Sequence, residues 1–150
     1  MEVVILMGIP GAGKSTFYRQ RFFDTHVRIN LDMLRTRHRE RTLFHACLAC
    51  GQDVVIDNTN PTAADRARYI GSAKAVGARI IGFYFRSRVS EAMRRNVERE
   101  GVRRVPDKAI FGIAGRLERP ALSEGFDTMF YVKCAGPGEF SVAEWKDDVH

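Results

Sequence analysis

Hydrophobic and polar positions alternate between two patterns along this chain. Near-continuous apolar runs such as "VVILM", "VVID" and "ARIIGFYF" are typical of parallel strands covered on both faces, and amphipathic stretches of helical period lie between them. The pattern predicts strands at Val3–Met7, Val27–Asn30, Asp53–Asp57, Ala78–Tyr84 and Thr128–Val132. It predicts helices at Lys14–Arg21, Leu31–Cys50, Thr62–Val76, Val89–Glu100 and Pro106–Arg116. We find no repeat or linker, so one doubly wound α/β domain over residues 1–150 accounts for the chain.

The chain is basic and carries no membrane signal. Its 24 Lys and Arg residues against 18 Asp and Glu residues give a formal net charge of +6, and Arg outnumbers Lys. Because guanidinium forms the better fork for phosphate, this favours an anionic partner, and a solvated basic surface without a partner is the alternative. No apolar window approaches the roughly 18 residues that a membrane helix needs. The N-terminus lacks the basic leader and cleavage site of a signal peptide, so we expect a cytoplasmic protein.

The cysteines do not suggest a metal site. Cys47 and Cys50 form a C-x-x-C, "CLAC", but there is no second pair, and His45 adds at most a third nearby ligand. A closed zinc site requires four ligands, so we interpret these cysteines as small apolar residues near the end of a helix.

The stretch "GIPGAGKST" carries the clearest chemistry. It satisfies G-x-x-x-x-G-K-[ST] between an apolar strand and a helix, which is the setting a phosphate-binding loop requires. Its glycines allow successive N–H groups to point at phosphate oxygens, Lys14 reaches the β- and γ-phosphates, and the Ser15 hydroxyl ligates Mg²⁺. The motif predicts binding of ATP or another nucleoside triphosphate by Pro10, Gly11, Ala12, Gly13, Lys14, Ser15 and Thr16.

Two carboxylates follow predicted strands. Asp57 ends "DVVID", where it could hold Mg²⁺, and its alternative is a helix N-cap. Asp32 follows the second strand, at the edge of the sheet that faces the ligand. There it could accept the proton of an attacking hydroxyl. The alternative is an Asp at the start of a helix, where its negative charge interacts favourably with the helix dipole. A helix through this region would place Asp32 and Arg35 on one face.

Arginines crowd the stretch "RRNVEREGVRR", residues 94–104. Arg95 and Arg99 are four positions apart and would share a helical face. Given a bound triphosphate, we expect a lid over residues 94–105 whose arginines neutralise charge on the transferred group. A solvated basic face is the alternative.

Five segments, in order, resemble the kinase domain of the 5′-hydroxyl polynucleotide kinases, most closely the kinase half of the eukaryotic polynucleotide kinase/3′-phosphatases. They are "GIPGAGKSTF", "RINLDMLR", "VVIDNTNPTAADRARYI", "NVERE" and "RPALSEGF", and the likeness runs from about residue 2 to residue 140. "IDNTNP" followed by "RARY" is more diagnostic than the phosphate loop, which many unrelated NTPases share.

The resemblance implies a three-layer, adenylate-kinase-like P-loop fold with a central parallel five-stranded sheet, helices on both faces and the Arg-bearing lid. It also implies transfer of the ATP γ-phosphate to the 5′-hydroxyl end of DNA or RNA. Asp32 falls at the family's general base, and Arg99 on its lid arginine. Thr59 and Asn60 match a segment close to the acceptor.

Three features depart from the family pattern. Leu31 stands where the family commonly has Arg, and Arg35 matches an acceptor-phosphate Arg of the phage-type enzymes that the eukaryotic type lacks. The chain has no D-x-D-G-T phosphatase motif, so we expect a kinase alone, working beside a separate phosphatase or ligase.

The stretch "GEFSVAEWKDDVH" either finishes the fold or packs against a nucleotide base.

Two other functions remain open on the sequence. A small-molecule hydroxyl kinase on the same scaffold would share the phosphate loop and the base, since fold does not determine the acceptor. A module that binds nucleotide without transferring phosphate would not need Asp32.

Overall fold

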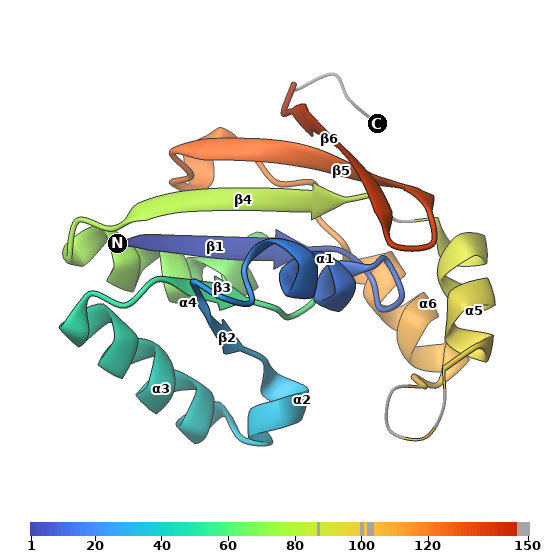
Figure 1. Ribbon diagram of the computed structural model, residues 1–150, viewed down its shortest axis with the longest axis horizontal. Coiled ribbons are helices and arrows are strands. Elements are labelled where there is room, and N and C mark those ends of the chain that lie inside the picture. Colours follow the sequence, from blue (N-terminus) through green and yellow to red (C-terminus); the bar gives the residue numbers. More distant parts are fainter. Residues whose placement is uncertain (87, 100, 102–103, 147–150) are drawn as a thin grey trace.

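A single twisted sheet lies at the centre of the molecule (Figure 1). The computed structural model describes residues 1–86, 88–99, 101 and 104–146. In this part of the chain the sheet has six strands in the order β2-β3-β1-β4-β5-β6. The strands are β1 (Glu2–Met7), β2 (Val27–Ile29), β3 (Val54–Ile56), β4 (Arg79–Phe85), β5 (Thr128–Gly136) and β6 (Glu139–Glu144). The first five are parallel to one another, as predicted, and β6 runs antiparallel to β5.

β6 forms a hairpin with β5 and is not among the strands that the sequence pattern predicts. Its side chains alternate, with Phe140 and Val142 half-buried and their neighbours exposed, which is the period of an edge strand. Trp145 follows β6 and is buried in the core. The C-terminal stretch therefore finishes the fold as far as Lys146, and residues 147–150 lie outside the described part of the chain.

Helices cover both faces of the sheet. On one face, Val3 of β1 shares a buried cluster with Phe44 of α3 (Arg37–Cys50) and Ile70 of α4 (Ala63–Ala75). On the other, Val4 shares a cluster with Phe17 of α1 (Lys14–Arg21) and with side chains of α5 (Val89–Val97) and α6 (Asp107–Arg116). Figure 1 shows α1 in front of the sheet and α4 behind it. This is the expected three-layer arrangement.

The helix predicted over Leu31–Cys50 is wrong, because the structure has two helices there. A one-turn helix, α2 (Leu31–Leu34), ends at Arg35, whose φ of 77° is left-handed. Thr36 then caps α3 by accepting a hydrogen bond from the Arg39 N–H. A Thr N-cap satisfies a free donor at the start of a new helix, so the chain breaks at this point.

No helix in the described part of the chain is long and apolar enough to cross a membrane.

Candidate active site

A cleft of about 410 Å³ opens at the carboxyl ends of β1, β2 and β3. Parallel strands that end together leave their following loops at one edge of the sheet, which is where ligands bind in this fold class. Nine of the predicted site residues line this cleft: Pro10, Gly11, Lys14, Ser15, Asp32, Asp57, Thr59, Asn60 and Arg99. Ala12, Gly13, Thr16, Arg35 and Arg95 are not among its described lining residues.

The phosphate loop joins β1 to α1, and two of its glycines have no room for a side chain. Gly11 has a φ of 84°, and a Cβ on it would lie 2.8 Å from the carbonyl oxygen of Ala92 in α5. Gly13 has a φ of 99°, and a Cβ there would lie 2.9 Å from the ring of Phe140 in β6. The backbone can therefore take the loop conformation only while these positions lack side chains.

Lys14 is the cation of the loop. Its Nζ donates hydrogen bonds to the carbonyl oxygens of Gly8 and Ile9, both at 2.8 Å. Burial lowers the pKa of Lys14 to about 8, against the opposing attraction of Asp57, and the positive charge of Arg99 lowers it further. The ammonium is thus buried beside a second cation, and an anionic ligand in the cleft would favour its charged form.

Ser15 and Asp57 meet in the cleft from α1 and the end of β3. The Ser15 hydroxyl donates to Asp57 Oδ2 at 3.0 Å, and Asp57 is only 2% exposed. Hydroxyl and carboxylate oxygens are the ligands that Mg²⁺ prefers, so Ser15 and Asp57 fit this ion. The N-cap alternative for Asp57 is wrong, because Thr62 caps α4 by accepting from the Asp65 N–H.

A residue that the sequence analysis missed contacts both members of this pair. Arg28 of β2 donates from Nε to Asp57 Oδ2 at 2.7 Å and from Nη2 to Ser15 Oγ at 3.1 Å. It gave no signal in the sequence, because only the register of β2 beside β3 brings it to Asp57.

Asp32 lies on α2 and is exposed at the cleft. The start of α2 is held by the loop that follows β3, since Asn58 Oδ1 accepts from the Leu31 N–H at 2.9 Å. Asn30 caps the helix and donates to the Asp57 carbonyl at 2.6 Å. Arg35 lies beyond the end of α2 with left-handed backbone, so the expected shared face of Asp32 and Arg35 does not form.

The loop after β3 is also tied to the phosphate loop. The carbonyl oxygen of Thr59 accepts from the Gly8 N–H at 3.0 Å, and the Asn60 side chain donates to the Leu6 carbonyl at 2.7 Å. Asn60 is 4% exposed, and its amide therefore supports the loop. A role for Thr59 or Asn60 toward an acceptor stays a prediction.

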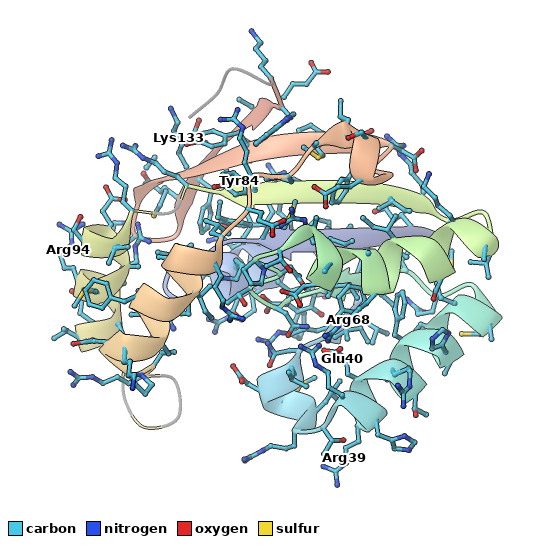
Figure 2. All side chains as sticks on the ribbon, turned by 180° about the vertical axis from the view of Figure 1, so that it is seen from behind. Arg39, Glu40, Arg68, Tyr84, Arg94 and Lys133 are labelled. Atoms are coloured by element: carbon cyan, nitrogen blue, oxygen red, sulfur yellow. The ribbon has the colours of Figure 1, made fainter. Side chains whose placement is uncertain are left out.

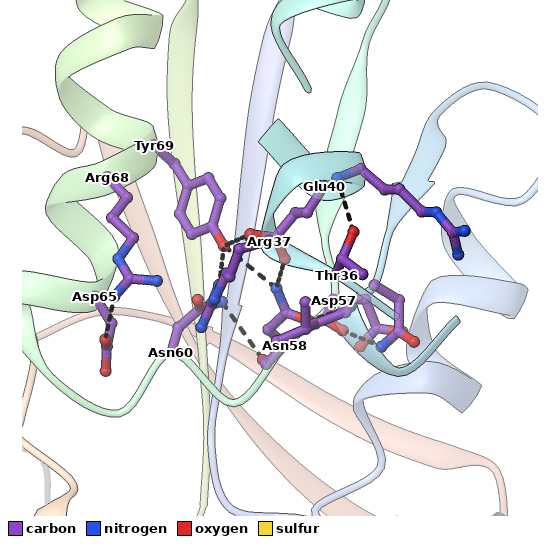
Figure 3. Close-up of polar contacts among 12 residues, drawn as sticks. Thr36, Arg37, Glu40, Asp57, Asn58, Asn60, Asp65, Arg68 and Tyr69 are labelled. Carbon is purple, nitrogen blue, oxygen red and sulfur yellow. Dashed lines mark hydrogen bonds and ion pairs between the residues drawn. The ribbon is translucent and has the colours of Figure 1, made fainter. Parts of the chain in front are cut away.

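A polar network, drawn in Figure 3, positions a second missed arginine. The buried carboxylate of Glu40 accepts from Tyr69 Oη at 2.8 Å, from Arg37 Nη1 at 2.9 Å and from Asn58 Nδ2 at 2.9 Å. Burial, together with the hydrogen bond to Glu40, raises the pKa of Tyr69 to about 12. Arg37 lines the cleft, and no described residue binds its Nε or Nη2.

The diagnostic segments around "RARY" and "RPALSEGF" meet inside the protein. Arg66 is fully buried and forms two hydrogen bonds to the Glu124 carboxylate, at 2.8 and 3.1 Å. It also donates to the carbonyl oxygens of Asn60 and Glu118. These buried contacts hold the loop after β3 in place. The two segments are therefore evidence for the fold, and they say less about which acceptor is bound.

The lid expected over residues 94–105 begins in the last turn of α5 and ends just before α6, and its role as a lid stays a prediction. Arg95 donates to the Gly11 carbonyl at 2.6 Å, which ties α5 to the phosphate loop. Asn96 exchanges two hydrogen bonds with the backbone of Val105, joining the segment to α5. Arg99 lines the cleft. Residues 100, 102 and 103 of the predicted lid lie outside the described residues.

Known proteins resemble the chain in sequence and fold. A family model described as AAA domain matches residues 35–120. The Schizosaccharomyces pombe bifunctional polynucleotide phosphatase/kinase is 31% identical over 83% of this chain, which spans about a third (32%) of that protein. Chaetomium thermophilum Kti12 in complex with ADP-AlF3 superposes with a TM-score of 0.65 at 18% identity, covering 89% of each chain. Mycobacterium tuberculosis APS kinase CysC, in complex with AMPPNP and APS, superposes with a TM-score of 0.62 at 18% identity. The match covers 91% of this chain and 90% of the CysC chain.

The solved structures share the fold, and the family match covers more than half of the 150 residues. This chain therefore has the P-loop kinase fold and belongs to the AAA domain family, among its polynucleotide kinase-like members.

Proposed function

We propose that this protein is an ATP-dependent phosphotransferase that phosphorylates the 5′-hydroxyl end of a polynucleotide. The observation that carries the proposal is the composition of one cleft, where Asp32 of α2 lines the same space as Lys14 of the phosphate loop and Arg99 of the lid. A carboxylate and two cations are the groups that a hydroxyl acceptor and a transferring phosphoryl group require.

Asp32 accepts the proton of the 5′-hydroxyl as its oxygen forms a bond to the γ-phosphorus. The bond between that phosphorus and the bridging oxygen of ADP breaks in the same displacement. Lys14 and Arg99 neutralise the charge on the transferring group. Ser15 and Asp57 would hold Mg²⁺, which when bound neutralises charge on the β- and γ-phosphate oxygens.

The surface beside the cleft supports a polynucleotide acceptor. Arg35, Arg37, Arg39 and Arg68 are all exposed on or near α3 and α4. Figure 2 shows Arg39 and Arg68 on this side of the molecule. Exposed guanidinium groups bind backbone phosphates without reading the bases. The likeness to a bifunctional polynucleotide phosphatase/kinase supports the same acceptor. A separate phosphatase or ligase acting on the same ends is part of this proposal.

The test compares acceptors at equal concentration with γ-labelled ATP. We expect 5′-hydroxyl DNA or RNA oligonucleotides to be labelled faster than sugars and nucleosides, with a KM for the oligonucleotide that rises with KCl. Faster labelling of a small hydroxyl compound would assign the protein to small-molecule kinases. ATP binding without any labelling would assign it to nucleotide-binding modules.

A further inference from the structure

Arg28 closes a triangle of hydrogen bonds at the proposed magnesium ligands. Its Nε donates to Asp57 Oδ2 and its Nη2 donates to Ser15 Oγ, while Ser15 Oγ donates to the same Asp57 Oδ2. The guanidinium therefore contacts both side chains that would hold the ion. The ion-pair distance is 2.7 Å, and the Arg28 side chain is 28% exposed, so this contact lies at the edge of the cleft.

The buried charge of Asp57 explains why a cation is needed there. Asp57 is 2% exposed, and an unpaired buried carboxylate is costly. Lys14 attracts Asp57 electrostatically, but its hydrogen bonds go to the Gly8 and Ile9 carbonyls. Arg28 therefore donates a charged hydrogen bond to this carboxylate where Lys14 does not.

We infer that Arg28 holds the divalent-cation site closed in the nucleotide-free protein, so that the cation enters only together with the triphosphate. Arg28 and a divalent cation require the same two oxygen-bearing side chains, and their positive charges repel each other strongly at such short range. The triphosphate brings several negative charges to the loop, which offset this repulsion. This inference rests on the magnesium role proposed for Ser15 and Asp57, and it does not depend on the acceptor.

In its present position Arg28 also contacts an aromatic ring, and it is partly open to solvent. Its guanidinium carbon lies 5.9 Å from the centre of the Tyr18 ring, on α1. A cation over an aromatic face is stabilised by the ring. β2 is one of the two edge strands of the described sheet, so the side chain has solvent on one side, into which it can move away from Asp57. An ion pair that served only to fasten β2 to its neighbours would affect stability and leave cation affinity unchanged.

The experiment measures binding of Mn²⁺, a spectroscopic substitute for Mg²⁺, by electron paramagnetic resonance of the free ion. We expect Arg28→Gln, without nucleotide, to bind Mn²⁺ about tenfold tighter than the wild type, because a competing positive charge has gone. Adding Asp57→Asn to that variant should abolish the gain. Arg79→Gln, at an exposed strand position away from the cleft, is the matched control and should behave as the wild type.

The outcomes separate this inference from the role on which it rests. If the wild type binds Mn²⁺ with AMPPNP present, but Arg28→Gln without nucleotide binds no tighter than the wild type, the inference is overturned and the magnesium role stands. If neither protein binds Mn²⁺ through Asp57 under any condition, both are wrong.

A measurement on the wild type avoids any folding defect of the variant. With ¹⁵N-labelled arginine, the Arg28 Nε–H signal should be unchanged by Mg²⁺ alone and should shift when Mg²⁺ and AMPPNP are added together. A shift with Mg²⁺ alone would overturn the inference.

Discussion

The Arg66 guanidinium binds the Glu124 carboxylate through two hydrogen bonds, of 2.8 and 3.1 Å, although the residues lie 58 positions apart. Arg66 is fully buried on α4, and Glu124 lies on the short helix η2 (Leu122–Glu124). Arg66 also donates to the Asn60 carbonyl at 3.0 Å, so the pair supports the loop that forms one wall of the cleft.

Breaking this pair should destabilise the fold. We expect Arg66→Ala to lower the free energy of unfolding by about 3–5 kcal/mol, because it leaves the Glu124 carboxylate without its charged partner. Urea denaturation followed by circular dichroism measures the change. The matched control is Arg68→Ala, two positions away on the same helix, whose ion pair with Asp65 is exposed and 3.9 Å long. It should cost at most about 1 kcal/mol. Equal losses in the two variants would contradict a structural role for Arg66.

Nucleotide affinity should fall in alkaline solution. In the free protein Lys14 loses its proton near pH 8, and a bound phosphate requires the charged form. If the complex keeps the proton, the Kd for AMPPNP should rise by about tenfold for each pH unit above 8, and should be flat below it. Fluorescence titration between pH 6.5 and about 9.5 measures this slope.

A side chain at position 14 that stays charged over this pH range provides the control. In Lys14→Arg the side chain stays protonated over this range. We expect this variant to bind AMPPNP with a higher Kd than the wild type, and that Kd should not change with pH. A parallel rise in both proteins would place the titrating group elsewhere.

Arg37 should contribute more to acceptor binding than Arg35. Glu40 holds Arg37 at the cleft with two nitrogens free of partners among the described residues, whereas Arg35 lies beyond the end of α2 and outside the cleft lining. We expect Arg37→Gln to raise the KM for a 5′-hydroxyl oligonucleotide roughly tenfold, the effect of losing one charge-assisted hydrogen bond. Arg35→Gln should raise it less. The reverse order would return the acceptor-phosphate role to Arg35.

Local patterns predicted much of this fold. The five parallel strands, the phosphate loop and α1 could be derived from apolar runs, glycine spacing and the helix that follows. The break at Thr36 was missed because "DMLRTRHRER" lacks Gly or Pro, and a Thr cap inside a helical pattern gives a weak signal. β6 was missed although its alternation was visible, since a short edge strand shows only two inward residues.

The site was predictable where one segment carries it and not where distant segments meet. Lys14 and Ser15 follow from the loop motif alone. Arg28 reaches Asp57 through the pairing of β2 with β3, and Arg37 is positioned by Glu40 and Tyr69, which packs from α4. Such partners depend on sheet register and helix packing, which the pattern of a single segment does not contain.

The most direct test of the account is label transfer from γ-labelled ATP to a 5′-hydroxyl oligonucleotide by the wild type and Asp32→Asn side by side. Removing a general base typically lowers the rate by about 10²–10⁴-fold. We expect a loss of this size, with AMPPNP affinity and the urea midpoint unchanged, because Asp32 is exposed on α2. Labelling of the oligonucleotide by Asp32→Asn at the wild-type rate, or its absence from the wild type, would contradict the proposed function.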